Sequence, residues 1–175
     1  KMKRIIIILL LSIFFTNKTF ALIEIDITRG NLDPLPIAVS PLHVDVKSEN
    51  TESIKIKELG ASISKIIENN FRGTGLFNPI KKEAFVQKPD IAHLKPRFED
   101  WRLIKAQALV TGKLLVSGDK LKVEFRLWDL AAAQEMTALA FTTTPSNWRR
   151  VAHIISDKIY ERLTGEEGYF DTRII

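Results

Sequence analysis

Residues 108–128 read ALVTGKLLVSGDKLKVEFRLW, in which two strand-like runs flank the pair Gly118-Asp119. A glycine-containing pair between two such runs is a hairpin signal. In the second run, one face carries Leu121, Val123, Phe125 and Leu127, and the other carries Lys122, Glu124, Arg126 and Trp128. A third strand-like run, residues 135–143, follows a corner at residues 129–131. The sequence therefore predicts a three-strand meander with one solvated face.

Apolar side chains recur at helical spacing on both sides of this meander. The last helix is predicted to begin at Pro145 or Ser146 and to end at Gly165. Its apolar stripe consists of Trp148, Val151, Ala152, Ile155, Ile159 and Leu163. An earlier helix is predicted from Thr51 or Ser53 until Gly73 and Gly75. Its apolar residues are Ile56, Leu59, Ile63, Ile66 and Ile67. Residues 98–108 predict another helix.

The remaining segments predict short strands and loops. Residues 22–28 alternate strictly, with Ile23, Ile25 and Ile27 on one side, which is typical of a half-buried strand. Residues 36–42 and 76–80 predict two more short strands, and residues 81–96 predict a loop with one helical turn. Together these elements predict the α/β class, as an α+β layer sandwich. We expect a mixed sheet of about five strands covered by two or three helices, like an anticodon-binding domain.

The positive charge of the chain is concentrated at its amino end. The 175 residues carry 26 Lys and Arg against 21 Asp and Glu, a net charge of +5. Residues 1–21 hold a basic start, an apolar run at residues 5–15 and small residues at Thr19 and Ala21. This layout predicts a signal peptide cut after Ala21. The apolar run would span about 16 Å, roughly half of a bilayer, so we expect no membrane-spanning segment and a soluble mature chain in the periplasm.

The 154 residues after Ala21 are nearly neutral, with 22 bases and 21 acids. This balance argues against nucleic-acid binding. The chain has no cysteine, and its three histidines, His43, His93 and His153, are widely separated. We find no nucleophile-elbow motif, no metal-ligand cluster and no phosphate-binding glycine loop. We therefore expect an interaction protein without a metal, cofactor, catalytic residue or small-molecule substrate. A secreted hydrolase that uses His43 or His153 is the alternative of a different class.

The carboxyl end carries one long motif. Residues 150–165 read RVAHIISDKIYERLTG, and they are followed by Gly168-Tyr169-Phe170 and Thr172-Arg173-Ile174. This run closely resembles the TolB family of the Tol–Pal cell-envelope system, as do residues 36–39 and 75–77. The resemblance covers essentially all of the chain after the signal peptide. It implies the TolB amino-terminal domain at residues 34–165 and a linker at residues 166–175 into a β-propeller that is absent from this sequence.

The resemblance also implies partners. In the family, the mature amino terminus binds the carboxyl-terminal domain of TolA, and the propeller binds Pal. Residues 22–33 would be the partner-binding segment here, and its contact residues would be Leu22, Ile23, Glu24, Ile25, Asp26, Ile27, Thr28, Arg29 and Gly30. The residues expected at the boundary with the propeller are His153, Asp157, Tyr160, Tyr169, Phe170 and Arg173. We expect the first three of these on an exposed face of the last helix.

Two alternatives remain open from the sequence. Residues 22–28 could pair within their own domain, or they could add as a strand to the sheet of TolA. The resemblance favours the second possibility. The alternative interaction function is that of a periplasmic accessory domain that regulates peptidoglycan synthesis.

Overall fold

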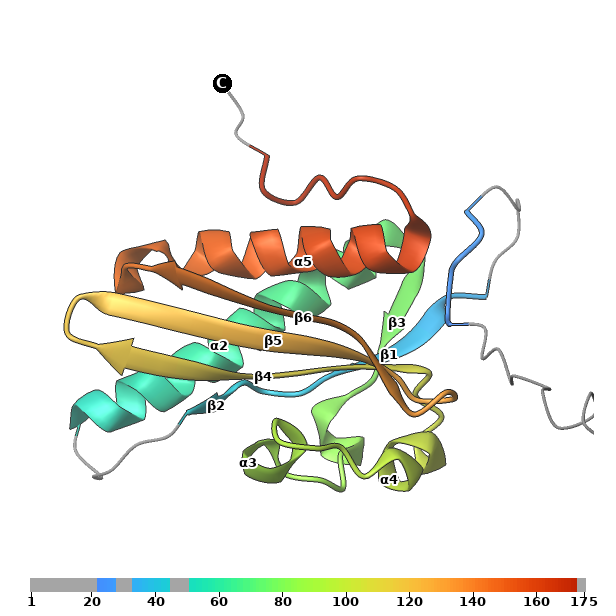
Figure 1. Cartoon of the computed structure of the whole chain (residues 1–175), viewed down its shortest axis with the longest axis horizontal. Helices are drawn as coiled ribbons and strands as arrows, with labels where there is room; N and C mark the ends of the chain where they lie inside the picture. Colours follow the sequence, from blue (N-terminus) through green and yellow to red (C-terminus); the bar gives the residue numbers. More distant parts are fainter. Residues whose placement is uncertain (1–21, 28–32, 45–50, 173–175) are drawn as a thin grey trace, which may run out of the picture.

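The computed structural model describes residues 22–27, 33–44 and 51–172, and its ribbon is drawn in Figure 1. Within these residues one mixed sheet contains the strands β1 (Leu35–Val39), β2 (His43–Val44), β3 (Phe77–Pro79), β4 (Ala108–Ser117), β5 (Lys120–Asp129) and β6 (Gln134–Thr143). The strand order is β3-β1-β4-β5-β6, and β2 pairs with β4 beyond the end of β1. The sheet has six strands rather than about five because the two-residue β2 was not predicted.

The direction of the strands follows their connections. β1 runs parallel to both β3 and β4, whereas β4, β5 and β6 form an antiparallel meander. The predicted hairpin at Gly118-Asp119 is confirmed, since Ser117 pairs with Lys120 across it. Gly118 has a φ of 58°, a conformation that glycine adopts without steric cost. The predicted α+β class and mixed sheet are therefore confirmed.

Two long helices, α2 (Thr51–Thr74) and α5 (Trp148–Thr164), lie side by side on one face of the sheet (Figure 1). They cover the inward side chains of β5, as its alternation predicts. The buried helix residues include Ile63, Ile67 and Phe71 from α2 and Val151, Ile155, Ile159 and Leu163 from α5. Full burial of each such side chain contributes about 1.5–3 kcal/mol, so this layer is the main core.

Among the described elements, those that cover the opposite face are α3 (Pro89–Ala92) and α4 (Phe98–Leu103), which lie at one end of it. The prediction that Trp128 lies on a solvated face is wrong, because its side chain is only 9% exposed. The ring of Phe98 packs edge-on against it at 5.9 Å, and its indole N–H donates to Thr111 Oγ1 at 2.9 Å. The two short helices thus build a second, smaller core around Trp101 and Trp128.

The helix boundaries follow local stereochemistry. The left-handed residue that follows α2 is Gly75, with a φ of 73°, and the one that ends α5 is Gly165, with a φ of 75°. Residues 98–108 form a shorter helix than predicted, since α4 ends at Leu103 and Lys105 has a φ of 61°. The chain has to turn there because the backbone N–H of Gln107 donates to the Pro36 carbonyl, which joins it to the sheet.

The predicted strand at residues 22–28 is wrong for the residues that the structure describes. Residues 22–26 have no regular secondary structure, and Ile27 lies in a turn. The predicted positions Thr28, Arg29, Gly30 and Arg173 and the proposed leader, residues 1–21, lie outside the described residues.

Candidate partner-binding surfaces

The amino-terminal segment, residues 22–27, packs against its own domain. The Ile25 N–H donates to the carbonyl of Leu163 at the end of α5, at 2.6 Å. The Ile23 N–H donates to Asp129 Oδ2 at 2.9 Å. Both isoleucine side chains are half-buried against the main core, whereas Leu22, Glu24, Asp26 and Ile27 are exposed. Alternate residues therefore face the domain, as in an extended backbone.

Asp129 holds this segment with a buried carboxylate. Its side chain is inaccessible to solvent, and its second oxygen accepts the Ala132 N–H at 2.9 Å. A buried carboxylate is tolerated when N–H groups satisfy it, so the segment supplies one of the contacts that Asp129 needs. No local sequence pattern predicts this contact, because Ile23 and Asp129 are 106 residues apart in the chain.

The predicted face of His153, Asp157 and Tyr160 is not a free surface. His153 is half-buried, and its Nδ1 lies 3.0 Å from the amide nitrogen of Asn70 on α2. The same amide donates to Ser156 Oγ at 2.9 Å. This face of α5 therefore packs partly against α2.

Asp157 holds the segment that follows α5. Its Oδ1 accepts the Phe170 N–H at 2.7 Å, and its Oδ2 accepts the Asp171 N–H at 3.0 Å. Residues 166–172 thus run back along the helix (Figure 1). Gly168 makes this approach possible, because a Cβ there would lie 2.4 Å from the Asp157 Cα.

Tyr160 is buried beneath the same returning segment. Its ring makes edge contacts with Phe77 at 6.2 Å, Tyr169 at 5.6 Å and Phe170 at 5.9 Å. Burial of the phenol raises the pKa of Tyr160 above its usual value, because the ionised form is poorly solvated there. The expectation of an exposed Tyr160 is wrong, since 8% of the side chain is accessible. In this cluster Tyr169, at 51% exposed, presents its ring to solvent.

A groove lies between α5 and β6 on the other side of the helix. A cavity of about 340 Å³ is lined by Glu24, Thr137, Leu139, Lys158, Glu161, Arg162 and Gly165. A second cavity, of about 200 Å³, is lined by Phe141, Thr142, Thr143, Asn147, Arg150, Val151 and Ile154. Glu24 therefore places the amino-terminal segment at one end of this groove.

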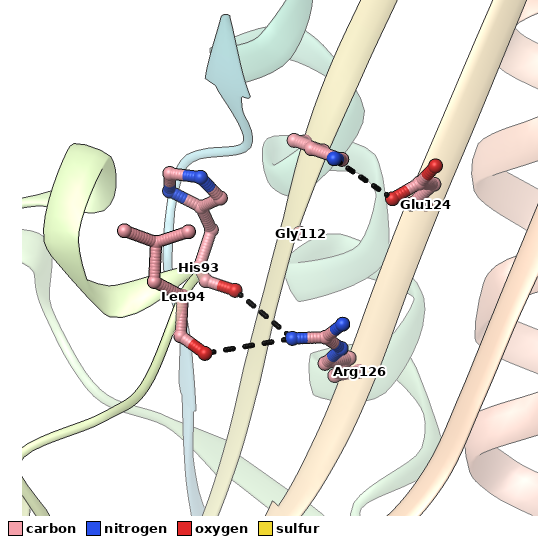
Figure 2. Close-up of a pocket in the computed structure, with 6 residues that line it drawn as sticks. His93, Leu94, Gly112, Glu124 and Arg126 are labelled. Atoms are coloured by element: carbon pink, nitrogen blue, oxygen red, sulfur yellow. Dashed lines mark hydrogen bonds and ion pairs between the residues drawn. The ribbon is translucent and has the colours of Figure 1, made fainter.

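A smaller pocket of about 60 Å³ lies where the loop after α3 meets the sheet (Figure 2). Arg126 donates to the carbonyl oxygens of His93 and Leu94 at 3.3 and 3.5 Å. Glu124 lies between Lys113 and Lys122, and hydrogen bonding from Lys122 lowers the pKa of Glu124. The charged side chains of the pocket are all engaged, since Lys113 pairs with Glu124 and Arg126 pairs with Glu135.

His93, which lines this pocket, stacks on His43 with ring centroids 4.2 Å apart. Stacked imidazoles direct their ring nitrogens side by side rather than toward one point, so this pair does not form a chelating site. Within the described ranges, no group of three or more His, Cys, Asp and Glu side chains is placed to hold a metal ion. The same residues include no helix that is both long enough and apolar enough to cross a membrane.

Comparisons with known proteins agree with the resemblance in the sequence. A family model described as the TolB amino-terminal domain matches residues 23–136. The Tol-Pal system protein TolB of Pelagibacter ubique (strain HTCC1062) is 68% identical over 168 residues. That match covers 95% of this chain and 38% of the relative's length.

A solved structure gives an independent comparison of the fold. The crystal structure of TolB from Acinetobacter baumannii superposes with a TM-score of 0.63 at 22% sequence identity. The superposition covers 79% of this chain and 30% of that chain. In both comparisons the chain spans well under half of the longer protein, so the match concerns one domain.

Proposed function

The chain belongs to the TolB amino-terminal domain family, and on that premise we propose that it is a periplasmic interaction domain of the Tol–Pal system. Its segment 22–30 binds the carboxyl-terminal domain of TolA. Pal recognition is assigned to the propeller of the longer family members and to no residue of this chain. The proposed role needs no catalytic step, because the domain acts by binding.

The observation that supports this proposal is the sparse attachment of residues 22–27. Two backbone N–H groups of the segment donate to the described part of the domain, Asp26 makes a further contact, and four of its six side chains are exposed. Each such hydrogen bond contributes about 0.5–1.5 kcal/mol, or about 1.5–3 kcal/mol when the acceptor is charged. Ordering the backbone costs about 1–2 kcal/mol for each residue. Two such bonds contribute only a few kcal/mol, and the cost of ordering six residues opposes them, so the segment can leave its own domain at modest cost.

The segment has the chemistry of an added strand once it is released. Ile23, Ile25 and Ile27 lie on one side of an extended chain, and Glu24 and Asp26 lie on the other. Such a strand adds to the edge of a sheet through its backbone and buries its apolar side in the partner. Because Ile23 and Ile25 are half-buried in their own domain, binding to TolA requires the segment to undock.

A synthetic peptide of residues 22–30 tests whether the segment suffices for binding. We expect it to bind the TolA carboxyl-terminal domain weakly and reversibly in a calorimetric titration. Ile25→Ser in the peptide should weaken binding about tenfold or more, since burial of an isoleucine contributes about 1.5–3 kcal/mol. Glu24→Gln is the matched control, and its affinity should stay close to that of the parent peptide.

Deletion of residues 22–30 from the whole chain tests whether the segment is necessary. The shortened chain should show no measurable binding to TolA while its circular dichroism remains that of the folded domain. Equal binding by the complete and the shortened chain would refute the proposal and leave only the family assignment.

A further inference from the structure

Strand β6 is a long open edge of the sheet. It lies at one end of the strand order, and its ten residues include no proline, lysine or arginine. The opposite edge is β3, which has three residues, one of them Pro79. Short strands and prolines are the usual means by which proteins prevent edge-to-edge pairing. β3 is protected in this way, and β6 is not.

The open part of β6 is residues 137–143. On one side it is limited by Met136, which lies at a bulge in the β5–β6 ladder and whose carbonyl accepts from Arg162 Nε at 3.5 Å. On the other side the chain leaves the sheet before Pro145. Within the described part of the chain, only β5 hydrogen-bonds to the backbone of residues 137–143. The side chain of Leu139 is 40% exposed.

The sequence of this stretch, TALAFTT, is self-complementary about its middle residue, Ala140. In an antiparallel pair of identical strands, the facing pairs are Ala140 with Ala140, Leu139 with Phe141, Ala138 with Thr142 and Thr137 with Thr143. Aromatic–aliphatic and threonine–threonine pairs across strands are stabilising. No charged side chain faces another in this register, so nothing in the stretch opposes self-pairing.

The two cavities of the groove between β6 and α5 differ in size in the same order as the side chains that this register would place beside them. Phe141 of a second copy would lie opposite Leu139, which lines the cavity of about 340 Å³. Leu139 of the second copy would lie opposite Phe141, which lines the cavity of about 200 Å³. The larger side chain therefore meets the larger cavity.

The charges that border this groove on α5 do not oppose the approach of a second copy. Lys158 pairs with Glu161 at 2.8 Å, and Arg150 pairs with Asp171 at 3.1 Å. Each of these two cations is thus paired with an acid of its own copy, and Arg162, the third cation at the groove, contacts the Met136 carbonyl. A two-fold axis perpendicular to the sheet would place both α5 helices on the same face.

We propose that residues 137–143 pair with the same residues of a second copy, which joins two sheets into one. This inference goes beyond the proposed binding of TolA and does not depend on it. Among the described strands, each copy has one long open edge. Because this edge is paired in the dimer, the association stops there and does not continue into a fibre.

Single cysteines test the register directly, because the chain has no cysteine of its own. Facing Cα atoms in an antiparallel ladder are about 4.5–5.5 Å apart, within reach of a disulfide, whereas diagonal neighbours at about 7–8 Å are not. Under mild oxidation, Ala140→Cys should form a covalent dimer and Leu139→Cys alone should not. A mixture of Leu139→Cys with Phe141→Cys should form the mixed dimer. Leu115→Cys, on the internal strand β4 and 38% exposed, is the matched control and should stay monomeric.

Sedimentation velocity of the complete chain tests the association without a crosslink. The weight-average mass of the wild type should double as the concentration is raised. Leu139→Lys should abolish that doubling, and Leu115→Lys should retain it. A wild type that stays monomeric would refute pairing with a second copy and leave the edge to a strand from another protein. Equal crosslinking at Leu115 and Ala140, or species larger than a dimer, would also overturn the proposal.

Discussion

At the scale of single residues, Asp129 connects two parts of the chain that are far apart in sequence. Its two carboxylate oxygens accept one N–H each, from Ile23 and from Ala132. The side chain is fully buried, so water cannot replace a lost donor without local opening. The contact with Ile23 is therefore one of the interactions that determine how often the amino-terminal segment is docked.

Replacing Asp129 with asparagine should shift the equilibrium between the docked and the undocked amino-terminal segment toward the undocked form. An asparagine oxygen can still accept from Ala132, but its NH₂ group cannot accept from Ile23. Loss of a hydrogen bond to a charged acceptor costs about 1.5–3 kcal/mol. Under the proposal that the undocked segment is the form that binds TolA, we expect the apparent affinity of the complete chain to rise about tenfold. Calorimetric titration of Asp129→Asn against the TolA carboxyl-terminal domain measures this change.

The free peptide of residues 22–30 is the control for this prediction, because it contains no competing domain. Its affinity defines the limit that the variant can approach. If Asp129→Asn binds TolA more weakly than the wild type, the docked conformation is the one that binds. The proposal that the segment undocks before it binds TolA is then wrong.

At the scale of elements, the meander and the two long helices followed from local sequence patterns. Alternation in residues 121–127 and helical spacing in residues 148–163 each report one buried face, and both faces are buried as predicted. The end of α4 could not be predicted in the same way. Apolar residues continue to Ala108, but the chain turns at Lys105 because Gln107 has to join β1, a contact 71 residues away in the chain.

Lys105 shows what this turn costs. Its φ of 61° is left-handed, which costs a residue with a Cβ about 1–2 kcal/mol relative to glycine. We therefore predict that Lys105→Gly has a free energy of unfolding about 1 kcal/mol higher than Lys105→Ala, since alanine keeps the strain. Chemical denaturation of both variants measures the difference.

The matched pair for this prediction is at Lys65, an exposed position inside α2. There glycine should be less stable than alanine by about 0.5–1 kcal/mol, because a helix interior favours alanine. If the glycine and alanine variants have the same order of stability at residues 105 and 65, residue 105 does not require a left-handed backbone.

At the scale of the whole molecule, the contacts of the candidate surfaces were harder to predict than the layers. Alternation predicted a strand at residues 22–28, but the described part of this segment instead docks through Leu163 and Asp129, which are distant in the chain. Tyr160 lies off the apolar stripe of α5, yet the returning segment buries it. Periodicity describes one face of one element and contains no information about such long-range contacts.

The contacts within the chain reduce the set of residues that are free to contact a following domain. His153 and Tyr160 have contacts within the chain, whereas the ring of Tyr169 is half exposed beside Phe170. In a longer family protein that continues past this domain, we therefore expect amide hydrogen exchange to slow most in residues 166–172, and less in residues 151–163. The comparison is between the present chain and the longer protein by mass spectrometry, with the exposed hairpin at Gly118 as the unchanged reference. Slowing confined to residues 151–163 would place the boundary on α5 itself, because a domain resting on Tyr169 has to cover the returning segment before it can reach the helix.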